Sequence, residues 1–152
     1  MRKNIFRFAA ILFVMALLLG GIAPAAAAEK TEYQCTETLV AILDPGTWSF
    51  PDGNLHIRGM VQLFREEAPD PRTVGNNTVV VNTNWRPDGT GPMWGTFRME
   101  TDEGGLWKGT WAGKMTEGGS FYQGVGDGFG LYAGMKLFVD MNYGVCQITI
   151  LN

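Results

Sequence analysis

Apolar and polar residues alternate in short stretches along most of this chain, and turn-forming residues separate the stretches. Alternation with a period of two is typical of a β-strand with one buried face. Clusters of Gly, Pro, Asp and Asn, such as Pro51-Asp52-Gly53, are typical of the tight turns that connect hairpins. The pattern predicts about eight strands, over residues 32–43, 55–65, 78–85, 93–101, 106–115, 120–125, 136–142 and 145–151.

Two of these segments indicate which side chains share a face. Side chains two residues apart lie on the same face of a strand, and we expect the apolar faces to form the core. In the segment 55–65 the apolar face holds Leu55, Ile57, Val61 and Leu63, and the opposite face holds His56, Arg58 and Gln62. In the segment 106–115 the apolar face holds Trp107, Trp111 and Met115, and the opposite face holds Lys108, Thr110 and Lys114.

Strands joined in sequence order by tight turns favour antiparallel neighbours, in a closed barrel or a β-sandwich. Glycines inside the strand patterns favour the barrel. They stand at Gly59, Gly95, Gly109, Gly113, Gly124 and Gly126. Glycine weakens a flat strand but allows sharp coiling, and an aromatic side chain of a neighbouring strand often covers the gap. We therefore expect an all-β domain over residues 29–152, a single antiparallel β-barrel, with a β-sandwich as an alternative.

The region from Trp94 to Asn142 repeats strand-length units that end in glycine: WGTFRME, GLWKGTWAGKM and FYQGVGDGFGLYAGMKL. This glycine rhythm resembles the small antiparallel barrels of the allene oxide cyclase and dirigent type. The resemblance implies a barrel and, by analogy, an enzyme of the cyclase or isomerase kind, but it assigns no catalytic residue to this chain. Gly46-Thr47-Trp48 is similar to the Gly-x-Trp of lipocalins, so a lipocalin-like barrel is a second alternative.

The first 28 residues follow a different pattern, which is typical of a cleavable secretory signal peptide. Arg2, Lys3 and Arg7 precede an uninterrupted apolar run over 8–19, and the small residues 25–28 offer a cleavage site. An uncleaved membrane anchor is the alternative, because residues 8–28 carry no charge. We expect cleavage after Ala28, export to the periplasm or the extracellular space, and no stable membrane span after cleavage.

Removal of residues 1–28 changes the charge of the chain. It leaves nine basic and fifteen acidic residues, a net charge of −6, with the basic residues scattered singly. A nucleic-acid surface needs clustered Lys and Arg, so nucleic acid is excluded as a partner. The sequence is compatible with an oligomer, about which it gives no further indication.

Cys35 and Cys146 stand near the two ends of the expected domain. An even number of cysteines in an exported protein favours a disulfide, which here would join the first strand to the last. Two buried free thiols are the alternative. A metal site is disfavoured because His56 is the single histidine, and we expect no metal and no cofactor.

Catalytic motifs are weak throughout the chain. A hydrolytic triad would have to use His56, while the two serines of the domain stand near turns. No amphipathic helix follows the glycine-rich run 124–130, so a dinucleotide site is not expected. Most carboxylates fall in turns, where they solvate loops or cap backbone amides.

Candidate binding residues come from strand interiors that combine aromatic and polar side chains. His56 and Arg58 share a face, as do Arg98 and Glu100, and these pairs face either solvent, which is the favoured expectation, or the barrel interior. Facing inward, they would form a pocket with the aromatic residues. The candidate ligand-binding set is Trp94, Trp107, Trp111, Tyr122, His56, Arg58, Arg98 and Glu100.

Three functions fit this reading. The favoured one is a non-enzymatic exported barrel that binds a small apolar or amphipathic ligand. The second is a cyclase-like or isomerase-like enzyme with an apolar cavity, which a buried Glu100 or Tyr122 would support. The third is a structural, oligomerising or carbohydrate-binding module that uses exposed aromatic residues such as Trp48, Trp85 or Trp94, and it requires a filled barrel.

Overall fold

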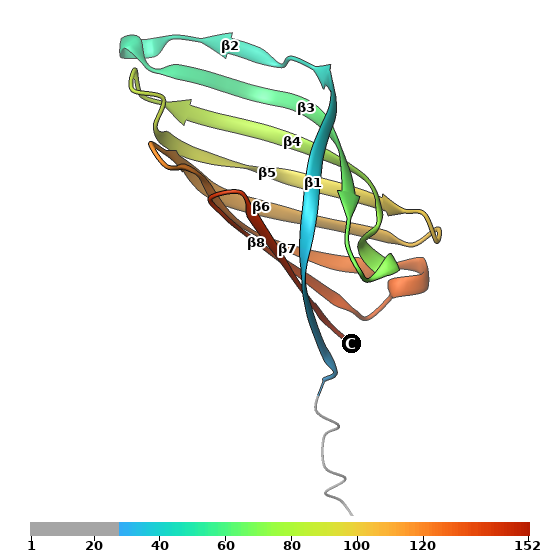
Figure 1. The fold of residues 1–152 in the computed structure, drawn as a ribbon. Coiled ribbons are helices and arrows are strands. Elements are labelled where there is room, and N and C mark those ends of the chain that lie inside the picture. Colours follow the sequence, from blue (N-terminus) through green and yellow to red (C-terminus); the bar gives the residue numbers. More distant parts are fainter. Residues whose placement is uncertain (1–27) are drawn as a thin grey trace, which may run out of the picture.

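The strands form a single antiparallel sheet in the computed structural model, which describes residues 28–152 (Figure 1). Their bounds are β1 Lys30–Asp44, β2 Thr47–Ser49, β3 Leu55–Glu67, β4 Gly75–Trp85, β5 Gly91–Thr101, β6 Leu106–Thr116, β7 Gly119–Phe129, β8 Lys136–Asn142 and β9 Val145–Leu151. Short 3-10 turns connect some of them: η1 Pro51–Gly53, η2 Pro71–Thr73 and η3 Gly130–Tyr132. Every segment expected from the sequence is a strand, and β2 is an additional short one.

The N-terminal predictions fall mainly outside the described residues. Of the signal peptide expected over residues 1–28, only Ala28 belongs to the part that the structure describes, so the peptide and its cleavage stay predictions. Within residues 28–152, no helix has the length and apolar character needed to cross a bilayer.

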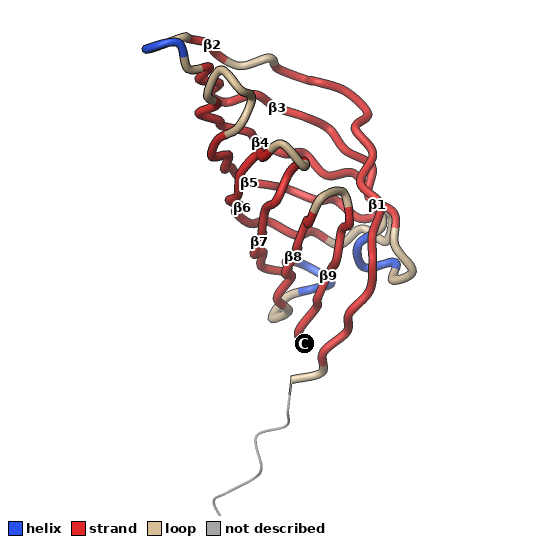
Figure 2. The backbone as a smooth tube through the Cα atoms, turned by 60° about the vertical axis from the view of Figure 1, so that its left-hand side comes forward, coloured by secondary structure: helices blue, strands red, loops and turns tan. Residues whose placement is uncertain are grey.

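Strand β1 closes the sheet into an eight-stranded barrel by pairing with two different strands. Its first part pairs with β9, from Lys30 opposite Leu151 to Cys35 opposite Cys146. Its second part pairs with β3, from residue 36 to residue 44. In Figure 1, β1 runs steeply across in front of the other strands, and in Figures 1 and 2 β2 lies at the rim, where it pairs with β3. The barrel is therefore confirmed, and the β-sandwich alternative is wrong because one sheet closes on itself.

A β-bulge interrupts β3 at Gly59. Ile57 stands opposite Thr83 of β4, and the next paired residues are Met60 and Val81. Between these two pairs β3 therefore contains one more residue than β4. Gly59 has a φ of +68°, a left-handed conformation that glycine adopts readily. The inserted residue shifts the alternation of β3 by one position.

This shift overturns the face predicted for the second half of β3. Leu55 and Ile57 belong to the core, as expected. After the bulge the even-numbered residues face the interior, including Gln62, so Val61 and Leu63 fall on the outer face. The prediction is wrong there because an unbroken period of two does not anticipate an inserted residue.

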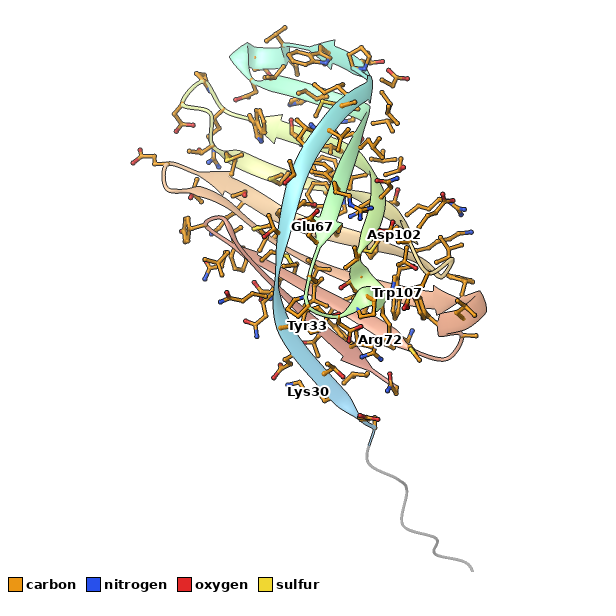
Figure 3. The ribbon with its side chains drawn as sticks, turned by 45° about the vertical axis from the view of Figure 1, so that its right-hand side comes forward. Lys30, Tyr33, Glu67, Arg72, Asp102 and Trp107 are labelled. Carbon is orange, nitrogen blue, oxygen red and sulfur yellow. A yellow bond between two sulfur atoms is a disulfide. The ribbon has the colours of Figure 1, made fainter. Side chains whose placement is uncertain are left out.

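One end of the barrel is sealed by aromatic side chains beside η2 and η3. Trp107 is fully buried and stacks on Tyr132, with ring centroids 5.0 Å apart. Its indole Nε1 donates a hydrogen bond to the carbonyl oxygen of Arg72 at 2.7 Å, and Figure 3 shows the two residues near each other. The hydroxyls of Tyr132 and Thr101 are 2.9 Å apart. These contacts close the barrel at the end where η2 and η3 lie.

Phe97 of β5 covers glycines on the two following strands. A Cβ atom at Gly109 would lie 2.5 Å from the Phe97 ring, and one at Gly126 would lie 2.7 Å from it. Only residues without a side chain fit under the ring at these two positions. The expected combination of an interior glycine and a covering aromatic residue is thus confirmed here.

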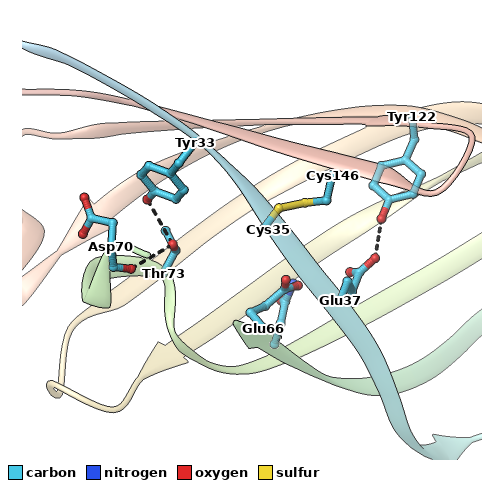
Figure 4. Close-up of a disulfide and its surroundings, with 9 residues drawn as sticks. Tyr33, Cys35, Glu37, Glu66, Asp70, Thr73, Tyr122 and Cys146 are labelled. Carbon is cyan, nitrogen blue, oxygen red and sulfur yellow. Dashed lines mark hydrogen bonds between the residues drawn. A yellow bond between two sulfur atoms is a disulfide. The ribbon is translucent and has the colours of Figure 1, made fainter. Parts of the chain in front are cut away.

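The two cysteines join the first strand to the last. Cys35 and Cys146 are direct cross-strand partners on β1 and β9, form a disulfide, and have Cα atoms 5.1 Å apart (Figure 4). This separation lies within the range that a disulfide requires. The predicted connection between the ends of the domain is therefore confirmed.

Candidate functional site

The interior of the barrel is not filled by side chains and contains a cavity of about 460 Å³. Trp107 and Tyr132, which form the sealed end of the barrel, do not line the cavity, so the cavity lies on the side of them that faces the opposite end of the barrel. Toward the other end its wall includes Trp85, Ser120 and Gly144, which lie next to the turns between successive strands. This volume falls within the range of small-molecule sites in proteins.

Most of the wall is apolar and adaptable. Five methionines line the cavity: Met60, Met93, Met99, Met115 and Met141. The aromatic part of the wall consists of Phe64, Trp85, Phe97, Trp111 and Tyr122. Methionine has a flexible, polarisable side chain, which lets a site adjust to ligands of different shape.

A polar cluster interrupts this wall between β1, β3, β4 and β7. Glu37 and Glu66 are direct cross-strand partners, and both line the cavity. The Tyr122 hydroxyl donates a hydrogen bond to Glu37 Oε2 at 2.5 Å, and Asn77 Nδ2 donates one to Glu66 Oε1 at 2.9 Å. Figure 4 shows the two carboxyl groups between β1 and β3, with Tyr122 directed at Glu37. We call these four residues the carboxyl cluster.

The cluster holds a proton that ordinary glutamates do not hold at neutral pH. Burial raises the pKa of Glu66 to about 8, and the charge of Glu37 adds to this rise, while the hydrogen bond from Asn77 opposes it. Burial and the neighbouring glutamates also raise the pKa of the Tyr122 phenol far above its ordinary value. The raised pKa of Glu66 favours retention of one proton by the pair of carboxyl groups, and the Tyr122 phenol keeps its proton and donates a hydrogen bond to Glu37.

Other buried polar atoms of the wall have no hydrogen-bond partner among residues 28–152. Asn77 is only 6 % exposed, and its Oδ1 accepts no hydrogen bond. The indole Nε1 atoms of Trp85 and Trp111 are likewise buried and unpaired. Unpaired buried polar groups are costly, and these three atoms leave one acceptor and two donors of the wall unsatisfied.

Two of the candidate residues from the sequence line the cavity, and a third closes it. Trp111 and Tyr122 are in the wall, with ring centroids 5.4 Å apart. Trp107 faces the interior but belongs to the sealed end. On β6, the predicted inner face with Trp107, Trp111 and Met115 is confirmed.

The other five candidates lie outside the barrel and do not line the cavity. Arg98 and Glu100 form an exposed ion pair, with Nη2 and Oε1 2.5 Å apart. The Arg58 guanidinium lies over the Trp94 ring, 5.1 Å from its centroid, and His56 sits on the same outer face of β3. The expectation of a solvent-facing position is correct for the polar pairs, and the inward-facing alternative is wrong.

Sequence reasoning missed three members of the carboxyl cluster. Extrapolating the predicted alternation past residue 65 would have directed Glu66 outward, because the bulge at Gly59 was not anticipated. A glycine inside a strand pattern is a known signal of a bulge and could have revealed it. Glu37 and Asn77 gave no comparable signal, because their position follows from the way β1 and β4 meet β3.

The fold and the cavity together define a class, that of small closed antiparallel β-barrels with an interior cavity. Comparison with protein-family models, curated proteins and solved structures found no match for the chain. The likeness to allene oxide cyclase and dirigent barrels thus stays a prediction from the glycine pattern.

Proposed function

We propose that this protein is an exported, non-enzymatic barrel that takes up a small apolar or amphipathic ligand. The observation that carries the proposal is the unfilled cavity of about 460 Å³ with its wall of methionine and aromatic side chains. An apolar molecule gains free energy by leaving water for such a wall, at roughly 25 cal/mol per Å² of buried surface. The cavity also argues against the surface-binding module, which required a filled barrel, although Trp48 and Phe50 are exposed.

Two features support export, the residue pattern of the first 28 residues and the disulfide of the barrel. The basic, apolar and small-residue segments of the N-terminus follow the order of a signal peptide. The disulfide between Cys35 and Cys146 is compatible with an oxidising compartment. Fusion of the full chain to a reporter that is active only outside the cytoplasm, combined with N-terminal sequencing, tests export and cleavage together.

Ligand uptake is testable with N-phenyl-1-naphthylamine, a neutral apolar fluorophore. We expect its emission to rise and that of Trp111 to fall on binding, because the Trp111 side chain lines the cavity. Gly124 faces the cavity, and a Cβ atom there makes only ordinary contacts of 3.5 Å or more. Gly124→Leu should therefore fill the space and reduce binding by about tenfold or more.

The matched control is Val125→Leu, one residue along the same strand on the outer face, where Val125 is 46 % exposed. It should leave binding unchanged. Saturable binding that Gly124→Leu and Val125→Leu affect equally would contradict a site in the cavity.

A second candidate function is acid–base catalysis, and the carboxyl cluster is the observation that favours it. A protonated Glu66 and its partner Glu37 could act as acid and base on one bound molecule, as proton transfer in an isomerase requires. The test is exchange of α-hydrogens of cyclohexanone in D₂O, followed by NMR. Catalysed exchange that Glu66→Gln abolishes supports this function, and exchange at the rate of buffer alone contradicts it.

A further inference from the structure

The acidic side of the cavity has no positive counterpart among the residues around it. Glu37, Glu66 and Tyr122 are the titratable groups in the wall, and no lysine, arginine or histidine of residues 28–152 lines it. Buried charges in proteins are normally paired. Two carboxylates opposite each other on adjacent strands repel, and a proton on Glu66 relieves the repulsion while the cavity is empty.

The same place also lacks hydrogen-bond donors. The side-chain amide N–H of Asn77 donates to Glu66. The buried Oδ1 of the same amide accepts no hydrogen bond from residues 28–152. Tyr122 supplies one donor to Glu37, which leaves further lone pairs of both carboxyl groups free. A group with several N–H donors and a positive charge would satisfy the acceptors and the charge at once.

We propose that the ligand of this cavity is an amine, whose ammonium group binds to Glu37, Glu66 and Asn77 Oδ1 while its apolar body contacts the methionine and aromatic wall. An ammonium group has three donors, the number of acceptor groups in the cluster. The rings of Trp111 and Tyr122 offer additional attraction for a cation. This proposal rests on the proposed function and specifies the class of its ligand.

Binding of the ammonium form would change the protonation of the cluster. In the empty cavity the raised pKa of Glu66 favours one proton on the two carboxyl groups, whereas an adjacent cation favours their ionised form. That proton then passes to solvent, so we expect binding of the ammonium ion near neutral pH to release protons. Calorimetric titration in two buffers of different ionisation enthalpy measures this release directly.

The decisive experiment compares octylamine, 1-octanol and octanoate, which share an alkyl chain and differ in the head group, by displacement of N-phenyl-1-naphthylamine. At about pH 7, where octylamine is cationic, we expect it to bind about tenfold or more tightly than 1-octanol, and octanoate to bind most weakly. Glu37→Gln and Glu66→Gln should each remove most of the preference for the amine while 1-octanol still binds. Glu67→Gln, an exposed neighbour outside the cavity, should preserve the preference.

The outcomes separate the two proposals. If 1-octanol binds as tightly as octylamine, or the preference survives in both glutamine variants, the amine proposal is wrong and the proposed binding function stands. If the naphthylamine probe and all three octyl compounds fail to bind, the proposed uptake of apolar or amphipathic ligands is wrong, and so is the amine proposal that rests on it.

Discussion

Glu66 shows how a single residue gives this barrel an unusual dependence on pH. It is 4 % exposed, next to Glu37, and hydrogen-bonded by Asn77. In the folded barrel its pKa is about 8, whereas a glutamate of the unfolded chain has a pKa of about 4.3. Between these values the folded state holds one more proton than the unfolded state.

We therefore expect the free energy of unfolding to fall as the pH rises from about 4.3 toward about 8 and to level off above that range. The slope is at most about 1.4 kcal/mol per pH unit for one proton. Glu66→Gln, which keeps the shape of the side chain without the titration, should flatten this dependence and make the barrel more stable than the original chain near pH 8. Urea unfolding at several pH values measures both effects.

Glu67→Gln is the control for this prediction. Glu67 follows Glu66 on the exposed face of β3 and does not line the cavity. Its replacement should leave the difference in stability between pH 5 and pH 8 as it is. An equal slope in the original chain and in Glu66→Gln would show that another group binds the proton.

At the scale of elements, the bulge in β3 determines which residues reach the cavity. Met60, Gln62 and Glu66 line it because Gly59 inserts one position into the strand. The Gly59 N–H also donates to Asn82 Oδ1 of β4 at 3.0 Å, which fixes the bulge against its neighbour. A strand without the insertion would direct these three side chains to the outer face.

Substitutions of Gly59 should separate backbone strain from packing. A Cβ atom there meets nothing within 4 Å, so the cost arises from the positive φ of 68° alone. We expect Gly59→Val to destabilise the barrel by about 2 kcal/mol or more and Gly59→Asn by clearly less, because asparagine tolerates the left-handed region. Urea unfolding gives both values, and equal losses would contradict the assignment of a bulge that requires this conformation.

The boundaries of most strands could be predicted because local residues determine them. Clusters of turn residues such as Asp102 and Gly104 end strands, and 136–142 and 145–151 were predicted with the bounds that the structure has. Strand β7 was expected to end at Val125, but it continues to Phe129 through a glycine-rich run. Pairing with β6 and β8 holds that run in the sheet, which the low strand propensity of glycine does not indicate.

The cavity residues were harder to predict, since they depend on contacts between distant strands. Trp111 and Tyr122 could be found because they are aromatic residues within strand patterns. Glu37 and Glu66 become partners only when β1 crosses to β3 and closes the barrel, and neither stands out in its own segment. Local alternation carries no information about that closure.

At the scale of the whole molecule, the disulfide should supply a large part of the stability. It joins residues 111 positions apart, which restricts the unfolded chain strongly. Cys35→Ala combined with Cys146→Ala should lower the free energy of unfolding by about 2–5 kcal/mol. Urea unfolding with and without a reductant measures the loss, and the reductant should have no effect on the double variant. A double variant as stable as the oxidised chain would contradict the prediction.

The division of β1 between two partners also sets the order in which the barrel can assemble. Its first part needs β9, the final strand of the described residues, so this seam cannot form until residues 145–151 have been synthesised. Pairings between residues so far apart in sequence form slowly. Until then β8 and the first part of β1 are unpaired edges, which are open to pairing with other chains. A chain cut short before Val145 would keep those edges permanently and should aggregate rather than fold.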